Sequence, residues 1–249
     1  MMENVVTRLL ATCPWKPTRE KFVAELERLL PFAESENRLT HFVPRLNSRK
    51  TQYHEALNEL RVAYFFHHNG FPIIQWEPRG ASGKVGECVI GTPEGKNVFV
   101  EVKSPGWEGE LDAEERKSGR TKLPKYHGPG GGGAVAPYIG HLKECVSRAY
   151  PKFAPTAANL LVVADDFFIP LAFTEIADAA LYDKADQSGD ELGIFGSRKY
   201  ENVGGIGIFD TDSEATVEYT LQVFRNPFAL PQTALPDSIG SRSGVKYVV

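Results

Sequence analysis

Two glutamates and a lysine in the middle of the chain have the residue types and spacing of a metal-dependent hydrolytic site. In the segment 98–104, Glu101 and Lys103 alternate with valines, so a strand here would point both side chains to the same face. The segment 86–90 predicts a second strand, and a hairpin could place Glu87 directly opposite Glu101, with Cβ atoms roughly 5 Å apart. Paired carboxylates suit Mg²⁺ or Mn²⁺, and the lysine could orient or deprotonate a water, or bind a phosphate.

The position of Glu87 depends on the register of this hairpin. The connection 91–97 contains the Pro and Gly residues of a turn, and a turn centred near Glu94 gives the opposed arrangement. A slip of one residue would turn Glu87 to the other face of the sheet. A surface hairpin with a cross-strand salt bridge between glutamate and lysine would contain the same residues, and it is the alternative to a metal site.

Further elements must hold these strands in place. A helix over 51–69 is the strongest in the sequence, because it carries an apolar stripe and is followed directly by a glycine that can end it. Glu59 lies at the edge of that stripe and could point toward the sheet. A strand over 71–77 precedes the hairpin. After the hairpin, 137–150 predicts a helix and the apolar run 159–164 a buried, parallel strand.

The two ends of the chain predict additions to this core. The segment 17–30 has the apolar spacing of a covering helix that Pro31 would stop, and the basic stretch up to Lys50 is interpreted as a connection rather than a binding site. The C-terminal part predicts a short helix and two strands that could extend the sheet edge, over 175–182, 206–209 and 216–224. The tail after them predicts no regular structure.

Length and composition are those of one globular domain. The chain has 249 residues, of which 42% are hydrophobic and 24% charged, which is enough to build one sizeable core. No apolar run approaches the roughly 20 residues of a membrane helix, and the N-terminus lacks the layout of a signal peptide. We therefore expect a cytoplasmic protein with no membrane partner.

Cysteine spacing and net charge exclude some classes of site. Cys13, Cys88 and Cys145 are scattered and form no C-x-x-C pair, which argues against a disulfide framework and a structural zinc site. The net charge of −4 gives no global reason to expect nucleic-acid binding. Any such interaction has to depend on local clusters of Lys and Arg.

The order of these elements and acids resembles the PD-(D/E)XK nuclease superfamily over roughly residues 51–165. Its members share a mixed sheet flanked by helices and cleave phosphodiester bonds, mostly of DNA, with a divalent metal. The resemblance implies a restriction-endonuclease-like core with the order αβββαβ. It also implies that Glu87 stands at the position of the metal-binding Asp, Glu101 is the second acid, Lys103 is the catalytic lysine and Glu59 completes the metal site. Gly86 and Glu87 replace the Pro-Asp pair of the family's name, so a longer side chain has to reach the metal.

Candidate substrate contacts follow the third strand. Five basic residues lie in one stretch after a run of acids, where contacts to a phosphate backbone are expected and a solvated loop is the alternative: Arg116, Lys117, Arg120, Lys122 and Lys125. The family resemblance adds Lys143 on the following helix. His141 and Cys145 are spaced i and i+4 but have no further ligand with them.

A glycine-rich stretch invites a competing interpretation. Residues 128–133 satisfy G-x-G-x-x-G, yet no strand runs into these glycines, as a dinucleotide-binding fingerprint requires. A hinge before the next helix is the simpler interpretation. A nucleotide-binding enzyme that uses this loop stays a third hypothesis.

We therefore expect one α/β nuclease-like domain over 1–249. The core would span about 51–165, with a helical extension over 1–50 and a C-terminal decoration over 166–249. The expected cofactor is Mg²⁺ or Mn²⁺, the expected partner is nucleic acid, DNA rather than RNA, and a homodimer is compatible with this fold. The rival hypothesis is a catalytically inactive module of the same fold that binds nucleic acid or a protein.

Overall fold

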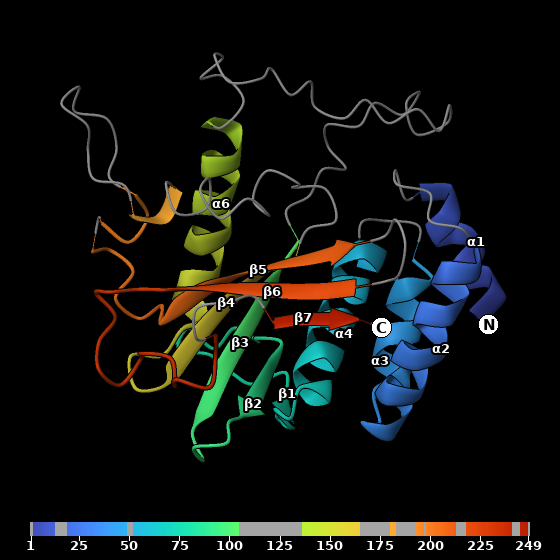
Figure 1. Cartoon of the computed structure of the whole chain (residues 1–249), viewed down its shortest axis with the longest axis horizontal. Helices are drawn as coiled ribbons and strands as arrows, with labels where there is room; N and C mark the ends of the chain where they lie inside the picture. Colours follow the sequence, from blue (N-terminus) through green and yellow to red (C-terminus); the bar gives the residue numbers. More distant parts are fainter. Residues whose placement is uncertain are drawn as a thin grey trace.

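The chain forms an α/β structure around an open, mixed sheet of seven strands, seen in Figure 1 with helices on both sides. The computed structural model describes residues 2–12, 19–48, 52–104, 136–164, 180–182, 193–196, 198–212, 218–240 and 245–248. The strands lie in the sheet in the order of the sequence, from β1 to β7. Their bounds are β1 Ile73–Trp76, β2 Cys88–Gly91, β3 Asn97–Lys103, β4 Ala158–Ala164, β5 Gly205–Asp212, β6 Glu218–Arg225 and β7 Val245–Val248.

The expected order of helix, three strands, helix and strand is confirmed. Helix α4 (Gln52–His68) precedes β1, and α6 (Ala136–Ala149) with the short 3-10 helix η2 (Tyr150–Lys152) precedes β4. Strands β1, β2 and β3 pair antiparallel, whereas β3 pairs parallel with β4, as the long apolar run predicted. Gly70 follows α4 with φ +82°, the left-handed conformation expected at this helix end.

The hairpin has the expected register from Cys88 to Gly91, but its regular ladder ends before the two acids. Cys88 pairs with Val100 and Gly91 with Asn97, and a ladder continued by one residue would bring Glu87 opposite Glu101. The Glu87 amide instead donates to the carbonyl of Val100 at 3.3 Å, the residue that already pairs with Cys88, so the pairing becomes irregular at Glu87.

Helix α4 is buried on two sides. Val62, Phe65 and Phe66 pack against alternate residues of the sheet, including Val100. A second strip of α4 residues packs against the N-terminal helices: Ala56, Leu57, Leu60 and Ala63. Most of the apolar stripe predicted for this helix thus packs against the N-terminal helices, and a different strip of the helix packs against the sheet. On the opposite face of the sheet, α6 covers Phe99, Leu161 and Val163.

The N-terminal extension is more helical than predicted. It contains α1 (Met2–Thr12), α2 (Arg19–Ser35) and α3 (Leu39–Leu46), which Figure 1 shows beside α4. The prediction that Pro31 stops the second helix was wrong, because Phe32 and Ala33 after it are buried in the helical core, and that burial offsets the hydrogen bond that proline removes. The segment interpreted as a connection contains α3, which packs on α4 through Phe42 and Leu46.

The C-terminal part extends the sheet. Strands β5 and β6 correspond to the two predicted strands; they pair antiparallel with each other, and β5 joins β4 in parallel. Strand β7 pairs with β6, although the tail predicted no regular structure. Of the short helix predicted over 175–182, only residues 180–182 lie within the described part of the chain, and they are helical.

Candidate functional site

The candidate site lies at the C-terminal end of β3. Glu101 is completely buried, and its Oε1 accepts hydrogen bonds from the Nζ atoms of Lys103 and Lys152. Lys103 leaves β3 on the same side as Glu101, as the alternation predicted, and both lysines are mostly buried. Burial disfavours the charged amine, but the ion pair with Glu101 offsets this and leaves the pKa of Lys103 above its usual value.

Lys152 was not predicted from the sequence. It ends η2, directly after the crossover helix, and no motif surrounds it. Its backbone is held by the loop before β2: the amide of Ala81 donates to the Lys152 carbonyl at 2.9 Å. A Cβ added to Gly80 would lie 2.2 Å from that carbonyl oxygen, so only glycine fits this approach. The loop that leads to Glu87 and the helix end that carries Lys152 are thus packed together.

Glu87 is electrostatically coupled to the other two acids. Burial raises its pKa to about 8, and the charges of Glu59 and Glu101 act in the same direction. Lys152 and Lys103 oppose the shift but do not cancel it. We call Glu59, Glu87 and Glu101 the carboxylate cluster. Glu87 therefore retains its proton at neutral pH in the absence of a bound cation.

Glu59 is held by an arginine from the N-terminal extension. Arg45 on α3 donates with both terminal nitrogens: Nη2 to Glu59 Oε1 at 2.6 Å, and Nη1 to Oε2. Burial raises the pKa of Glu59 despite this contact, and the Glu101 charge contributes to the rise. The stretch before Lys50 thus contacts a candidate site residue through Arg45, from a helix where a connection was expected.

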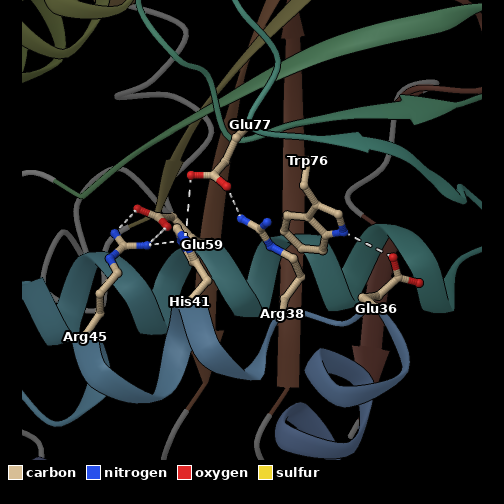
Figure 2. Close-up of polar contacts among 7 residues, drawn as sticks. All are labelled: Glu36, Arg38, His41, Arg45, Glu59, Trp76 and Glu77. Atoms are coloured by element: carbon tan, nitrogen blue, oxygen red, sulfur yellow. Dashed lines mark hydrogen bonds and ion pairs between the residues drawn. The ribbon is translucent and has the colours of Figure 1, made fainter.

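A run of polar contacts continues from Arg45 along α3, as Figure 2 shows. Arg45 Nη1 lies 2.8 Å from His41 Nε2, and His41 Nδ1 lies 3.7 Å from Glu77, which follows β1. Arg38 bonds to Glu77, which lowers the pKa of that acid, and its guanidinium lies 5.4 Å from the centre of the Trp76 ring. The contacts join α4, α3 and the end of β1.

A buried polar network lies behind the site. Arg61 on α4 binds both oxygens of Glu25 on α2, at 2.7 and 3.0 Å, and the hydroxyl of Tyr219 donates to the same carboxylate. Arg61 also binds Asn58, whose side-chain amide donates to Ser104 at 3.1 Å and to the end of β4. The residue directly after Lys103 is thus tied to α4.

The carboxylate cluster has the donor type of a hard-cation site but not a preformed arrangement. Glu101 Oε2 is buried and has no hydrogen-bond partner among the described residues. Across those same residues, no group of three or more His, Cys, Asp or Glu is arranged to hold a metal ion. The cluster instead meets three cations of the chain itself: Arg45, Lys103 and Lys152. A divalent ion would have to exchange with these contacts.

The other predicted site residues lie either outside the described part of the chain or on helix α6. The basic stretch Arg116, Lys117, Arg120, Lys122 and Lys125 and the glycines of 128–133 lie outside the described residues. Lys143 is half-buried on α6, nine residues before Lys152. Cys145 is buried in the hydrophobic core under that helix, beside Leu142 and Val146, which gives it a packing role.

The chain matches no protein-family model, and no curated protein and no solved structure is significantly similar to it. Among the helices in the described ranges, none is both long and apolar enough to span a membrane.

Proposed function

We propose that the protein is a metal-dependent nuclease that hydrolyses phosphodiester bonds, with DNA rather than RNA as the expected substrate. One observation carries the proposal. Glu101 and Lys103 share a face of β3, and Glu87 before β2 and Glu59 on α4 both interact electrostatically with Glu101. A buried oxygen of Glu101 has no protein partner in the described part of the chain. Buried groups with strongly perturbed pKa values are frequent at catalytic sites.

The order and pairing of the elements support the same proposal. The run from α4 through β1, β2, β3 and α6 to β4 has the αβββαβ order of the restriction-endonuclease-like core. The three acids and Lys103 occupy the elements on which that family carries its motif. The assignment to the family stays part of this proposal.

The roles of the residues follow from their surroundings. Glu87, Glu101 and Glu59 would hold Mg²⁺ or Mn²⁺, which when bound polarises a phosphate and lowers the pKa of a water. Glu101 accepts hydrogen bonds from two lysine amines on one oxygen, and its other oxygen is left to act as a ligand. The Lys103 amine is fixed at the edge of the cluster, where it can orient a water or stabilise developing negative charge. Glu87 has to release its proton before it can bind a cation, so binding should strengthen as pH rises.

A cleavage assay with Mg²⁺ or Mn²⁺ tests the proposal on single- and double-stranded DNA and RNA. We expect the wild-type protein to cut at least one of these forms, and Lys103→Ala to abolish the cut while leaving the fold intact. Lys96→Ala is the matched control, because Lys96 is exposed in the turn of the same hairpin. Equal cleavage with and without Lys103 would refute the assigned mechanism.

The second candidate, a module of the same fold without catalysis, has one observation in its favour. Arg45, Lys103 and Lys152 already form ion pairs with acids of the carboxylate cluster, so their positive charges compensate the cluster without a metal. Titration calorimetry with Mn²⁺ separates the two candidates. A binding heat that disappears in Glu101→Ala supports the enzyme, whereas no heat in the wild type supports the module.

A further inference from the structure

We infer that the loop 79–85 and the end of α6 form a surface that binds the phosphate backbone of a nucleic acid beside the candidate site. We call Arg79, Ser82, Lys84 and Arg148 the basic surface. The inference rests on the substrate class of the proposed function and says where that substrate is held. It needs no metal ion, because the contacts join cations and polar groups of the chain directly to phosphate oxygens.

The loop carries positive charge that no described acid compensates. Residues 78–86 include Arg79 and Lys84 and no Asp or Glu. Both residues are exposed, and neither side chain forms an ion pair or a hydrogen bond within the described part of the chain. Glu77, which precedes the loop, is bonded to Arg38 instead. The two cations of the loop are therefore left to attract an anion from solution.

The conformation of the loop is fixed by its own backbone. Arg79 and Val85 form a β-bridge, and the amide of Gly80 donates to the carbonyl of Lys84 across it at 2.8 Å. Gly83 lies between them with φ +73°, a conformation that glycine adopts without strain. A loop that is ordered in advance loses less entropy when it binds a ligand, which favours affinity.

Small residues at the tip leave the backbone of the loop open to a ligand. Ala81, Ser82 and Gly83 are exposed, and the amide and hydroxyl of Ser82 bind no group of the described residues. Phosphate oxygens are commonly bound by hydroxyls, backbone amides and basic side chains. The loop offers all three kinds of donor.

The loop is packed against an element of the candidate site. The amide of Ala81 donates to the carbonyl of Lys152 at 2.9 Å, and the Lys152 amine bonds to Glu101. No side chain fits at Gly80 beside that carbonyl, so the two segments are in direct backbone contact. A nucleic acid on the loop would therefore lie next to the lysines of the site.

Arg148 adds positive charge from the neighbouring helix. Its side chain is 68% exposed, and it lies close enough to Lys103 for the two positive charges to interact. Its contact with Glu144 at 3.6 Å joins two exposed groups, and such a pair contributes little and is easily exchanged for a phosphate. Like charges gathered in one region raise the local concentration of anions there.

Binding of fluorescent DNA and RNA oligonucleotides to the full chain in EDTA tests the inference. EDTA removes divalent ions, so the result depends on neither a bound metal nor cleavage. We expect Arg79→Gln/Lys84→Gln to bind at least about tenfold more weakly than the wild type at about 50 mM salt. The slope of log Kd against log salt concentration should fall by about 2, because each lost phosphate contact lowers it by about 1. Arg148→Gln alone should lower the slope by about 1.

Two controls separate a phosphate contact from a general effect of charge or stability. Arg28→Gln/Lys96→Gln removes the same charge from exposed positions on α2 and in the turn between β2 and β3, and should bind as the wild type does. All these variants change exposed side chains and should keep the wild-type midpoint of urea unfolding. Poly-glutamate as a competitor tests for an acidic protein partner, and it should displace the oligonucleotide far less readily than unlabelled DNA does.

The outcomes separate this inference from the proposed function. Wild-type affinity and salt slope in the variants of the basic surface would overturn the inference and leave the nuclease proposal as it stands. Equal displacement by poly-glutamate and by DNA would overturn the choice of a phosphate partner. Weaker binding by the variants of a protein that cuts no nucleic acid with Mg²⁺ would support the surface and refute the nuclease. No binding of DNA or RNA by the wild type would overturn the surface and the expected substrate together.

Discussion

In the metal-free protein, Glu87 should make the folded state less stable as pH rises from 6 to 8. Its pKa is about 8 in the folded chain, against an ordinary value of 4.5 for a glutamate in water. Between these values the folded state keeps the proton and the unfolded state releases it, so folding takes up a proton and raising the pH opposes it. At about 1.4 kcal/mol per pH unit, less near the upper pKa, this gives a loss of about 2 kcal/mol over the interval. Glu87→Gln cannot titrate and should remove that loss.

Urea unfolding at pH 6 and pH 8 in the presence of EDTA measures this difference. The control Glu94→Gln changes an acid in the turn of the same hairpin, whose pKa is lowered to about 2 by its hydrogen bond to Ser238. That acid titrates below the measured interval, so its variant should show the wild-type dependence on pH. Glu87→Gln should instead gain about 2 kcal/mol relative to the wild type as pH rises. If its free energy of unfolding followed the wild-type slope, the burial and coupling assigned to Glu87 would be wrong.

Three further changes test contacts around the site, each by urea unfolding. Arg61→Met leaves Glu25 buried without the arginine that binds both its oxygens, and should lower the free energy of unfolding by about 3–5 kcal/mol. The control Arg28→Met, at an exposed position, should lower it by less than about 0.5 kcal/mol. A loss below about 1 kcal/mol for Arg61→Met would contradict the buried pair. Gly80→Ala places a Cβ against the Lys152 carbonyl and should lower both stability and Mn²⁺ affinity, and an unchanged affinity would show that the loop does not position Lys152. Lys152→Gln removes one of two amines from a buried oxygen and should cost about 1–3 kcal/mol; no loss would mean that Lys103 alone suffices.

The hairpin at the site was predictable because its information is local. Alternation over β3 sets which side chains share a face, and the turn after β2 sets the register of the hairpin from Cys88 to Gly91. The helix with Glu59 was predictable for the same reason. The helical spacing of its apolar residues and the glycine that follows it are both visible in one short stretch of sequence.

Lys152 and Arg45 were not predictable because their roles depend on tertiary contacts. Each is one basic residue among many, and its neighbours in the sequence carry no pattern that marks it. Arg45 reaches Glu59 only because α3 packs on α4, and an apolar stripe does not reveal which element will cover it. Pro31 misled the prediction similarly, since burial of the following turn outweighs a local helix-breaking preference.

Helix α4 contributes side chains to two hydrophobic cores of the molecule. One side of the helix packs against the sheet and the other packs against the N-terminal helices, so both cores are incomplete without it. A fragment that begins at residue 52 would expose the apolar strip from Ala56 to Ala63 to water, and an exposed strip of this kind favours aggregation. The N-terminal helices are therefore part of the packed core.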